Sequence, residues 1–144
     1  MSAAPPPCLF CRIARGDAPA ARVLDTKTVT AFLDHRPLFP GHCLVIPRAH
    51  VETLGDLPGP LTAPLFEAAA AVARALEAGL GADGSFVAVN NRVSQSVPHL
   101  HVHVVPRRRG DGLRGFFWPR GRYESAAAME ETRARIAGAL AAGA

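Results

Sequence analysis

Apolar residues recur at intervals of three and four over residues 61–80, a spacing that is typical of a helix with one buried face. The stripe consists of Leu61, Leu65, Ala69, Val72, Leu76 and Leu80. Glycines follow at positions 81 and 84, and glycine is a common helix terminator. We therefore predict one long helix over residues 61–80.

Short runs of apolar and β-branched residues between turn residues predict five strands. The expected ranges are 22–24, 29–34, 42–46, 85–89 and 99–105. A loop over residues 36–41 is expected because two prolines and a glycine cannot sustain either regular periodicity. Pro47 and Pro106 are expected to stop the third and fifth strands because proline lacks a backbone N–H group.

The order of these elements predicts an α+β fold, in which a five-stranded antiparallel sheet carries the long helix on one face. A short helical turn is expected over residues 8–16, and a shorter C-terminal helix over about 125–142. Three consecutive prolines predict a disordered tail over residues 1–7. Residues 8–144 are expected to form a single domain, with a core over 8–107 and a basic-aromatic segment over 107–122.

The composition is that of a globular protein: 49% of the 144 residues are hydrophobic and 19% are charged. No apolar run reaches the roughly 18 residues of a membrane span. The first residues lack the positive charge and apolar stretch of a secretory signal, and three cysteines are too few for a disulfide framework. These features predict a cytoplasmic protein that does not enter a membrane.

The formal net charge of +4 comes mostly from arginine, since Lys27 is the only lysine. Part of the excess lies in the consecutive arginines at 107–109. One interpretation is a solvated basic surface, and the other is attraction of an anionic small molecule or a nucleic acid. Arginine suits phosphate because its planar guanidinium makes bidentate contacts.

The most informative segment is His99-Leu100-His101-Val102-His103. Side chains alternate along an extended chain, so the three histidines share one face while the apolar residues point to the other. Neighbouring histidines on that face are ~6.6 Å apart and the outer two ~13 Å, whereas zinc binds nitrogen at ~2.0–2.1 Å. All three cannot bind one ion, so we expect them to divide the work.

A second constellation is Cys8-x-x-Cys11 together with His50, which offers three of the four ligands of a tetrahedral zinc site. One histidine of the strand could supply the fourth ligand. The alternative is a buried cysteine pair beside a surface histidine. Redox chemistry is less favoured because no βαβ pattern surrounds the pair.

A polar loop over residues 90–96 precedes the histidines. Its hydroxyl, amide and backbone N–H groups could bind phosphate oxygens, because such donors stabilise negative charge. Taken alone, such a loop is more often an ordinary turn, and the three neighbouring histidines shift the interpretation toward a functional role.

Together these motifs resemble the histidine triad family, whose signature is His-x-His-x-His followed by two hydrophobic residues. The resemblance covers residues 8–107. It includes Gln95-Ser96, Phe32-Leu33-Asp34, the stretch 41–50 (GHCLVIPRAH) and Cys8-Leu9-Phe10-Cys11.

The resemblance implies a nucleotide hydrolase or nucleotidyl transferase that acts at an α-phosphate through a covalent nucleotidyl-histidine. His101 matches the nucleophile, and neutral imidazole is competent for this role near physiological pH. His103 would bind the α-phosphate oxygens and assist proton transfer. Gln95 and Ser96 would contact phosphate or the leaving group, and His42 would support the site from behind. The expected substrate is a purine nucleoside phosphoramidate or a dinucleoside polyphosphate.

The resemblance also implies a nucleotide pocket, a metal and a partner. Asp34 matches the residue that binds the ribose hydroxyls, and Asn90 a polar group near the phosphate. The residues that match the apolar base slot are Leu9, Phe10, Ile13, Phe32 and Leu44. Cys8, Cys11, His50 and His99 match the ligands of a structural zinc ion, and relatives are homodimers.

The sequence departs from the family pattern in two places. The loop before Gln95 is short and lacks the usual glycines. A long basic-aromatic segment follows the triad, and Trp118 or Arg120 could cover a leaving group in the partner's site. The alternative is that the aromatic residues pack in the dimer and the arginines face solvent.

Two other functions compete with this one: a non-catalytic nucleotide-binding or interaction protein, and a hydrolase of nucleic-acid ends. Binding to nucleic acid is not favoured.

Overall fold

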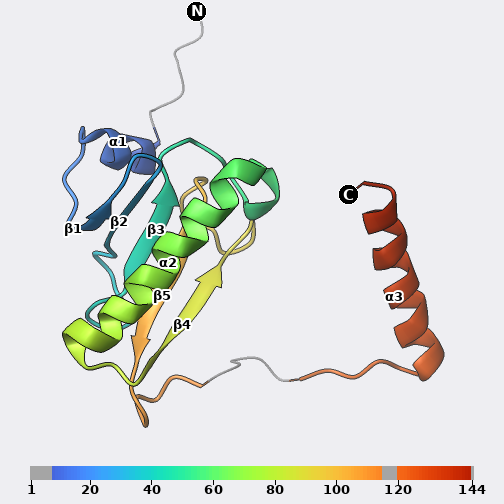
Figure 1. The fold of residues 1–144 in the computed structure, drawn as a ribbon. Coiled ribbons are helices and arrows are strands. Elements are labelled where there is room, and N and C mark those ends of the chain that lie inside the picture. The colour runs from blue at the N-terminus through green and yellow to red at the C-terminus, as the bar shows by residue number, and fades with distance from the viewer. Residues whose placement is uncertain (1–7, 115–119, 144) are drawn as a thin grey trace, which may run out of the picture. The chain divides into compact units, whose positions relative to one another are not determined.

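The computed structural model describes residues 8–114 and 120–143. The chain divides into two compact units, and the boundary along the sequence falls between Asp111 and Gly112. The tail expected over residues 1–7 and the expected role of Trp118 lie outside the described residues. Among the described residues, the first unit contains the sheet, two α-helices and a short 3-10 helix at Leu54–Asp56, and the second contains the C-terminal helix (Figure 1).

Five antiparallel strands form one sheet in the order β1-β2-β3-β5-β4. Their bounds are β1 Arg22–Asp25, β2 Val29–Leu33, β3 Cys43–Pro47, β4 Gly84–Val89 and β5 Val102–Arg107. This confirms the predicted fold class. The order places β5 between β3 and β4, so the end of the histidine segment lies inside the sheet and not at its edge.

Helix α2, Gly59–Leu80, crosses one face of the sheet and forms the larger core with it (Figure 1). Its buried residues Leu65, Ala69, Val72 and Leu76 belong to the predicted stripe. Leu100, Val102 and Val104, which alternate with the histidines, are fully buried in the same core. The apolar face of the histidine segment therefore meets the long helix, as its alternation predicts.

The opposite face of the sheet carries a smaller core formed by helix α1, Leu9–Arg15. Phe10 and Ile13 of this helix pack with Phe32, Leu44 and Ile46 of β2 and β3. The helix ends at Gly16, whose φ of 84° is the left-handed conformation that favours glycine at helix ends. The histidines face this side of the sheet, so α1 lies next to them, and its Phe10 contacts the rings of His99 and His101.

The predicted strand over residues 99–105 is wrong at both ends, since β5 begins at Val102 and continues to Arg107. The ladder between β3 and β5 stops at the Val45–Val102 pair, near the point where Pro47 has no N–H group to offer. The Leu100 N–H bonds instead to the Val51 carbonyl at 2.7 Å. Pro106 is tolerated in β5 because only β4 pairs with the strand at that position.

The second unit contains helix α3, Ala126–Ala141, which agrees with the helix predicted over about 125–142. Its N-cap is Ser125, whose hydroxyl accepts a hydrogen bond from the Ala128 N–H group at 3.0 Å. None of the residues of this helix is buried. Among the described residues, no helix combines the length and hydrophobicity needed to span a bilayer.

Candidate active site and metal centre

A cavity of about 460 Å³ opens on the α1 side of the sheet. Its walls include the side chains expected for a base slot, and its polar residues include Asp34, Ser96, His101 and His103. The apolar wall consists chiefly of Leu9, Phe10, Ile13, Phe32 and Leu44. One cavity therefore brings together an apolar slot, a carboxylate and two of the three strand histidines.

His101 is 3% exposed and lies with its ring edge-on to Phe10, at a centroid distance of 5.2 Å. Its Nδ1 is 2.7 Å from the carbonyl oxygen of His99. A carbonyl can only accept, so Nδ1 carries the proton and donates it. In the neutral ring, Nε2 then holds an unshared electron pair, and this is the nitrogen that can act as a nucleophile.

His42 and His103 form a directed pair behind this cavity. The backbone N–H group of Leu38 donates to His42 Nδ1 at 3.1 Å, so the proton of the neutral His42 ring must be on Nε2. That Nε2 lies 3.0 Å from His103 Nδ1 and donates to it. His103 consequently carries its own proton on Nε2.

The Nε2 atom of His103 is buried and has no hydrogen-bond partner in the structure. Burial lowers the pKa of His103 to about 4, with smaller contributions from His101 and His42, so the ring is neutral at physiological pH. Burial also lowers the pKa of His42, although Asp34 opposes this shift. A neutral N–H donor without a partner beside a cavity is suited to bind an anionic oxygen of a ligand.

Asp34 follows β2 and lines the cavity. Its Oδ2 is 3.8 Å from His42 Nε2, which is too far for a hydrogen bond. Its Oδ1 accepts a hydrogen bond from the Arg36 N–H group at 2.9 Å. The carboxylate is thus oriented by the following loop and remains available to hydroxyl donors of a ligand.

The polar loop before the histidines is only partly directed into the cavity. Ser96 lines it, whereas Gln95 is occupied by its own surroundings: its amide donates to the Glu52 carbonyl and its oxygen accepts from the Arg92 N–H group. Asn90 is exposed after the end of β4 and does not line the cavity. The expected contacts of Gln95 and Asn90 with phosphate are therefore not preformed.

Four potential metal ligands meet beside the cavity. The ligand atoms of Cys8, Cys11, His50 and His99 all lie within 4.8 Å of one another. His99 Nδ1 is 3.5 Å from each cysteine sulfur and 3.2 Å from His50 Nδ1, and the Cys11 sulfur is 3.3 Å from His50 Nδ1. Tetrahedral zinc, with bonds of about 2.3 Å to sulfur and 2.0–2.1 Å to nitrogen, would separate S from N by about 3.6 Å and N from N by about 3.3 Å. The cluster is therefore compatible with zinc.

The protonation of His99 supports the same interpretation. Its Nε2 donates to the Pro47 carbonyl at 2.8 Å, so Nδ1, the atom that faces the cysteines, carries the unshared pair. Burial lowers the pKa of this fully buried ring, which keeps it neutral. Metal-binding histidines commonly donate their other N–H group to a carbonyl in this way.

Sequence reasoning missed three contributors to the site: the Leu38 N–H group, the Pro47 carbonyl and the His99 carbonyl. Each is a backbone group that selects the tautomer of a histidine. No side-chain pattern encodes them, because every residue has a carbonyl and nearly every residue an N–H group. Exposed His35, which also lines the cavity, was not predicted either.

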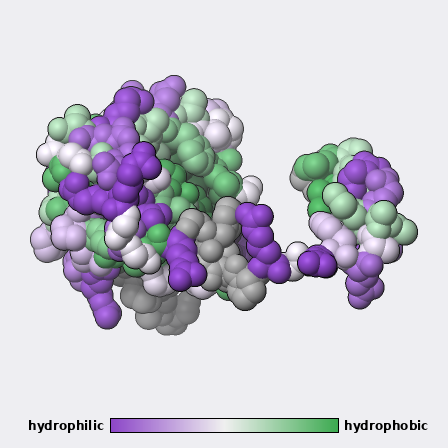
Figure 2. All heavy atoms as spheres, turned by 90° about the horizontal axis from the view of Figure 1, so that it is seen from below, coloured by the Kyte–Doolittle hydropathy of each residue, from purple (hydrophilic) through white to green (hydrophobic). Residues whose placement is uncertain are grey.

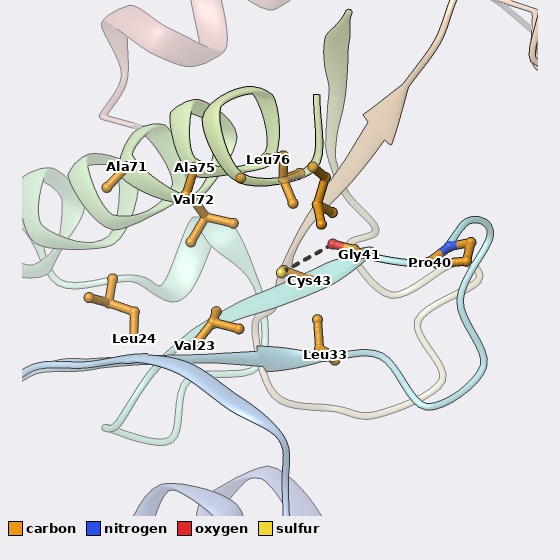
Figure 3. A pocket seen from close by; sticks show the side chains of 12 residues that line it. Val23, Leu24, Leu33, Pro40, Gly41, Cys43, Ala71, Val72, Ala75 and Leu76 are labelled. Carbon is orange, nitrogen blue, oxygen red and sulfur yellow. Dashed lines mark hydrogen bonds between the residues drawn. The ribbon is translucent and has the colours of Figure 1, made fainter. Parts of the chain in front are cut away.

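A larger cavity, of about 580 Å³, lies on the opposite face between α2 and the β1 side of the sheet (Figure 3). Its walls are apolar, and the only hydrogen bond drawn among them joins the Cys43 thiol to the Gly41 carbonyl at 3.2 Å. It contains none of the histidines. The smaller cavity is therefore the candidate active site.

Comparison with known proteins agrees with this geometry. The HIT domain family matches residues 15–110. An uncharacterised HIT-like protein of Mycobacterium tuberculosis is 40% identical over 109 residues, which is 74% of this chain and 76% of that protein. Adenosine 5'-monophosphoramidase of Schizosaccharomyces pombe is 33% identical over 114 residues, which is 78% of this chain and 83% of that protein.

Among solved structures, a zinc-bound histidine triad family protein from Mycobacterium smegmatis is 40% identical and superimposes with a TM-score of 0.71. The match covers 92% of this chain and 96% of that protein. Sequence and fold therefore indicate the same set of relatives.

Proposed function

Since this chain belongs to the HIT (histidine triad) domain family, we propose that it is a nucleotide hydrolase or nucleotidyl transferase with His101 as its nucleophile. The observation that carries the proposal is the hydrogen bond from His101 Nδ1 to the His99 carbonyl. It leaves Nε2 unprotonated in a ring that borders the cavity. A protein that only bound nucleotides would not need this tautomer.

The proposed reaction has two displacements at the α-phosphorus. In the first, the Nε2 electron pair of His101 forms a bond to phosphorus while the bond from phosphorus to the leaving group breaks. The leaving group keeps the electron pair of the broken bond and takes a proton from solvent. In the second, water forms a bond to phosphorus, the P–N bond returns its electrons to Nε2, and the proton of water goes to solvent. The sum consumes one water and releases a nucleoside monophosphate.

The remaining groups have complementary roles in this scheme. The Nδ1–H bond to the His99 carbonyl stabilises the positive charge that develops on the His101 ring. The unpartnered Nε2–H group of His103 binds a phosphoryl oxygen, with His42 holding its tautomer. Asp34 would accept the ribose hydroxyls, the apolar wall would hold the base, and Ser96 would face the leaving group.

The substrate we propose is a purine nucleoside phosphoramidate or a dinucleoside polyphosphate. The activity in the name of the Schizosaccharomyces pombe relative supports the first class.

We also propose a structural zinc ion, held by the two cysteines with His50 and His99. The distances above and the zinc-bound relative support it. With four protein ligands the ion has no open position, so it would anchor α1 to the histidine segment without taking part in the reaction. A homodimer and a cytoplasmic location complete the proposal.

Mass spectrometry tests the nucleophile directly. The protein is incubated with adenosine 5'-phosphoramidate or diadenosine tetraphosphate, quenched rapidly and digested, and an adenylyl adduct is sought on the peptide that contains residues 99–103. We expect the adduct on His101, and His101→Ala should abolish both adduct and turnover. His35→Ala is the matched control, because His35 lines the same cavity but is exposed. Undiminished turnover in His101→Ala, or an adduct on another residue, would refute the mechanism.

A further inference from the structure

Two arginines that lie outside the walls of the candidate active site bind the same short helix. The Arg22 guanidinium donates to the carbonyl of Ile13, and the Arg48 guanidinium donates to the carbonyl of Ala14. Both carbonyls belong to the last turn of α1, where a helix leaves C=O groups without intrahelical partners. Cations are favourable there because these carbonyls carry partial negative charge. The two arginines therefore fix the C-terminal end of α1.

All three nitrogens of the Arg48 guanidinium have partners. Besides the Ala14 carbonyl, Arg48 binds the Thr26 carbonyl through Nε at 2.7 Å and forms an ion pair with Asp25. Hydrophilic side chains cover much of the main body in the view of Figure 2, as expected for groups in contact with water. The Arg48 side chain is only 29% exposed, so protein acceptors replace much of its hydration. Two separate segments thus meet at one planar, rigid cation.

Helix α1 depends on such anchors because it is short. Seven residues are too few for a helix to be stable on its own in water. Near its N-terminal end, the two cysteines of the candidate zinc cluster lie close to His50 and His99. The arginines hold the other end. Three side chains of the apolar wall belong to this helix, namely Leu9, Phe10 and Ile13. The position of that wall is therefore set from both ends of α1.

Residues 47–50 connect these anchors with the histidine segment. The Pro47 carbonyl accepts from His99 Nε2 at 2.8 Å, Arg48 binds the end of α1, and His50 belongs to the metal cluster. The hydrogen bonds that select the tautomers of His99 and His101 do not involve Arg48. Removing its guanidinium should therefore loosen α1 without disturbing these rings.

We infer that Arg22 and Arg48 are positioning residues for recognition of the nucleotide base, because they hold α1 and its part of the apolar wall against the sheet. Since the proposed function places the base against this wall, the role rests on that function. The groups proposed to act on ribose and phosphate come from other segments: Asp34 follows β2, and His101 and His103 belong to the histidine segment. Loss of either arginine should weaken contacts with the base and spare those with ribose phosphate.

Two probes separate these contributions: adenosine 5'-monophosphate, which contains a base, and ribose 5-phosphate, which lacks one. NMR titration gives both dissociation constants for the zinc-loaded wild-type protein and for Arg48→Met, which keeps an apolar stem and removes the donors. We expect the constant for adenosine 5'-monophosphate to rise about tenfold, and that for ribose 5-phosphate to change less than about twofold. With adenosine 5'-phosphoramidate, KM should rise by about the same factor while kcat stays within about twofold. Arg22→Met should give the same pattern.

Two control variants distinguish the position of α1 from charge and from general stability. Arg15→Met removes a charge from the same end of α1, but the Arg15 side chain pairs with Asp17 on the surface, so both constants should stay within about twofold of the wild type. Leu65→Ala weakens the larger core on the other face of the sheet. At a temperature where the variant is folded, it should bind both probes like the wild type.

Hydrogen exchange provides a readout that needs no nucleotide. In Arg48→Met, the amides of Leu9–Arg15 should exchange at least about tenfold faster than in the wild type, because the end of α1 has lost its anchor. The amides of β5 should exchange at their original rates. Arg15→Met should leave both sets unchanged.

Three results would each overturn the role of the arginines: equal loss of affinity for both probes, unchanged affinity for adenosine 5'-monophosphate, or unchanged exchange in α1. Failure of the proposed function has a different signature, which the wild-type protein alone reveals. Binding of adenosine 5'-monophosphate without an adduct on His101 would refute the nucleophile and leave the role of the arginines intact. No binding of adenosine 5'-monophosphate by the wild-type protein would refute both.

Discussion

The two ring nitrogens of His42 have different tasks, and this leads to a prediction that can be tested with three substitutions. Nδ1 accepts from the Leu38 N–H group at 3.1 Å, which supports the fold, whereas Nε2 donates to His103 at 3.0 Å, which selects the tautomer of His103. His42→Leu removes both hydrogen bonds while keeping an apolar side chain of similar size in a site that is only 4% exposed.

The two expected losses can be estimated separately. Removing the acceptor leaves the Leu38 N–H group unpaired, which costs about 1–3 kcal/mol when the group is buried. Leu38 is 57% exposed, so water can replace part of that bond, and we expect the free energy of unfolding to fall by about 1 kcal/mol. Removing the donor forfeits a hydrogen bond of about 1–1.5 kcal/mol that holds the His103 tautomer, which corresponds to a loss of roughly tenfold in kcat.

Two further substitutions separate these effects. The side-chain oxygen of asparagine lies near the position of Nδ1, and the side-chain nitrogen of glutamine lies near that of Nε2. His42→Asn should therefore restore stability but not kcat, and His42→Gln should restore kcat but not stability. The assays are urea unfolding and hydrolysis of adenosine 5'-phosphoramidate. Imidazole ¹⁵N chemical shifts provide a readout that does not need a substrate, because they report which nitrogen of His103 is protonated.

The reasoning fails if His42→Leu leaves the His103 tautomer and kcat at their original values. It also fails if asparagine restores kcat as well as glutamine does, because the donor nitrogen would then be irrelevant.

Three other predictions follow from the same structure. Cys11→Ser should abolish zinc binding and lower Tm, while Cys43→Ala, a buried thiol outside the cluster, should retain zinc; elemental analysis of both variants checks this. Because burial depresses the pKa of His103 from 6.5 to about 4, the unfolded chain takes up that proton first, and the free energy of unfolding should fall by up to about 3 kcal/mol between pH 6.5 and pH 4. Urea titrations of His103→Gln over this range should show a shallower decline, and an unchanged slope would contradict the assignment. Leu65→Ala should lower the free energy of unfolding by about 2–5 kcal/mol, because Leu65 is fully buried. Val93→Ala should lower it by less than about 0.5 kcal/mol, because that side chain is 80% exposed. Chemical denaturation of both variants measures the difference.

Local patterns were sufficient for the layers of this fold. The period of the apolar residues in 61–80 predicts α2 to within two residues and four of the five residues that it buries, because a helix needs a continuous apolar stripe to pack on a sheet. Ala68 is the buried residue that it misses, and Leu80, at the end of the predicted stripe, is 48% exposed. Alternation around His101 likewise predicts that the imidazoles share one face opposite Leu100 and Val102. That prediction survives although the ladder starts only at Val102, since alternation requires an extended backbone and not a paired one.

Other features depend on segments that are distant in sequence. Where β5 begins depends on the end of β3, because strand pairing needs a partner with free backbone groups. The larger cavity is lined by residues of α2 together with residues of β1 and β2, and no periodicity within α2 reveals that they meet. Gln95 matches a phosphate-binding position by motif, yet its amide is bound to a carbonyl 43 residues away along the chain.

By itself, the sequence determined which chemical groups are present and which of them lie on one face: three imidazoles on an extended segment, and a pair of cysteines spaced for a metal. Only the tertiary structure decided which nitrogen of each ring is free. The Pro47 carbonyl directs His99 Nδ1 toward the cysteines, the His99 carbonyl leaves His101 Nε2 unprotonated, and the Leu38 N–H group acts through His42 on His103. The reason is physical: a neutral imidazole has one proton and two possible positions for it, and the choice depends on the hydrogen-bonding group that the fold places beside each nitrogen.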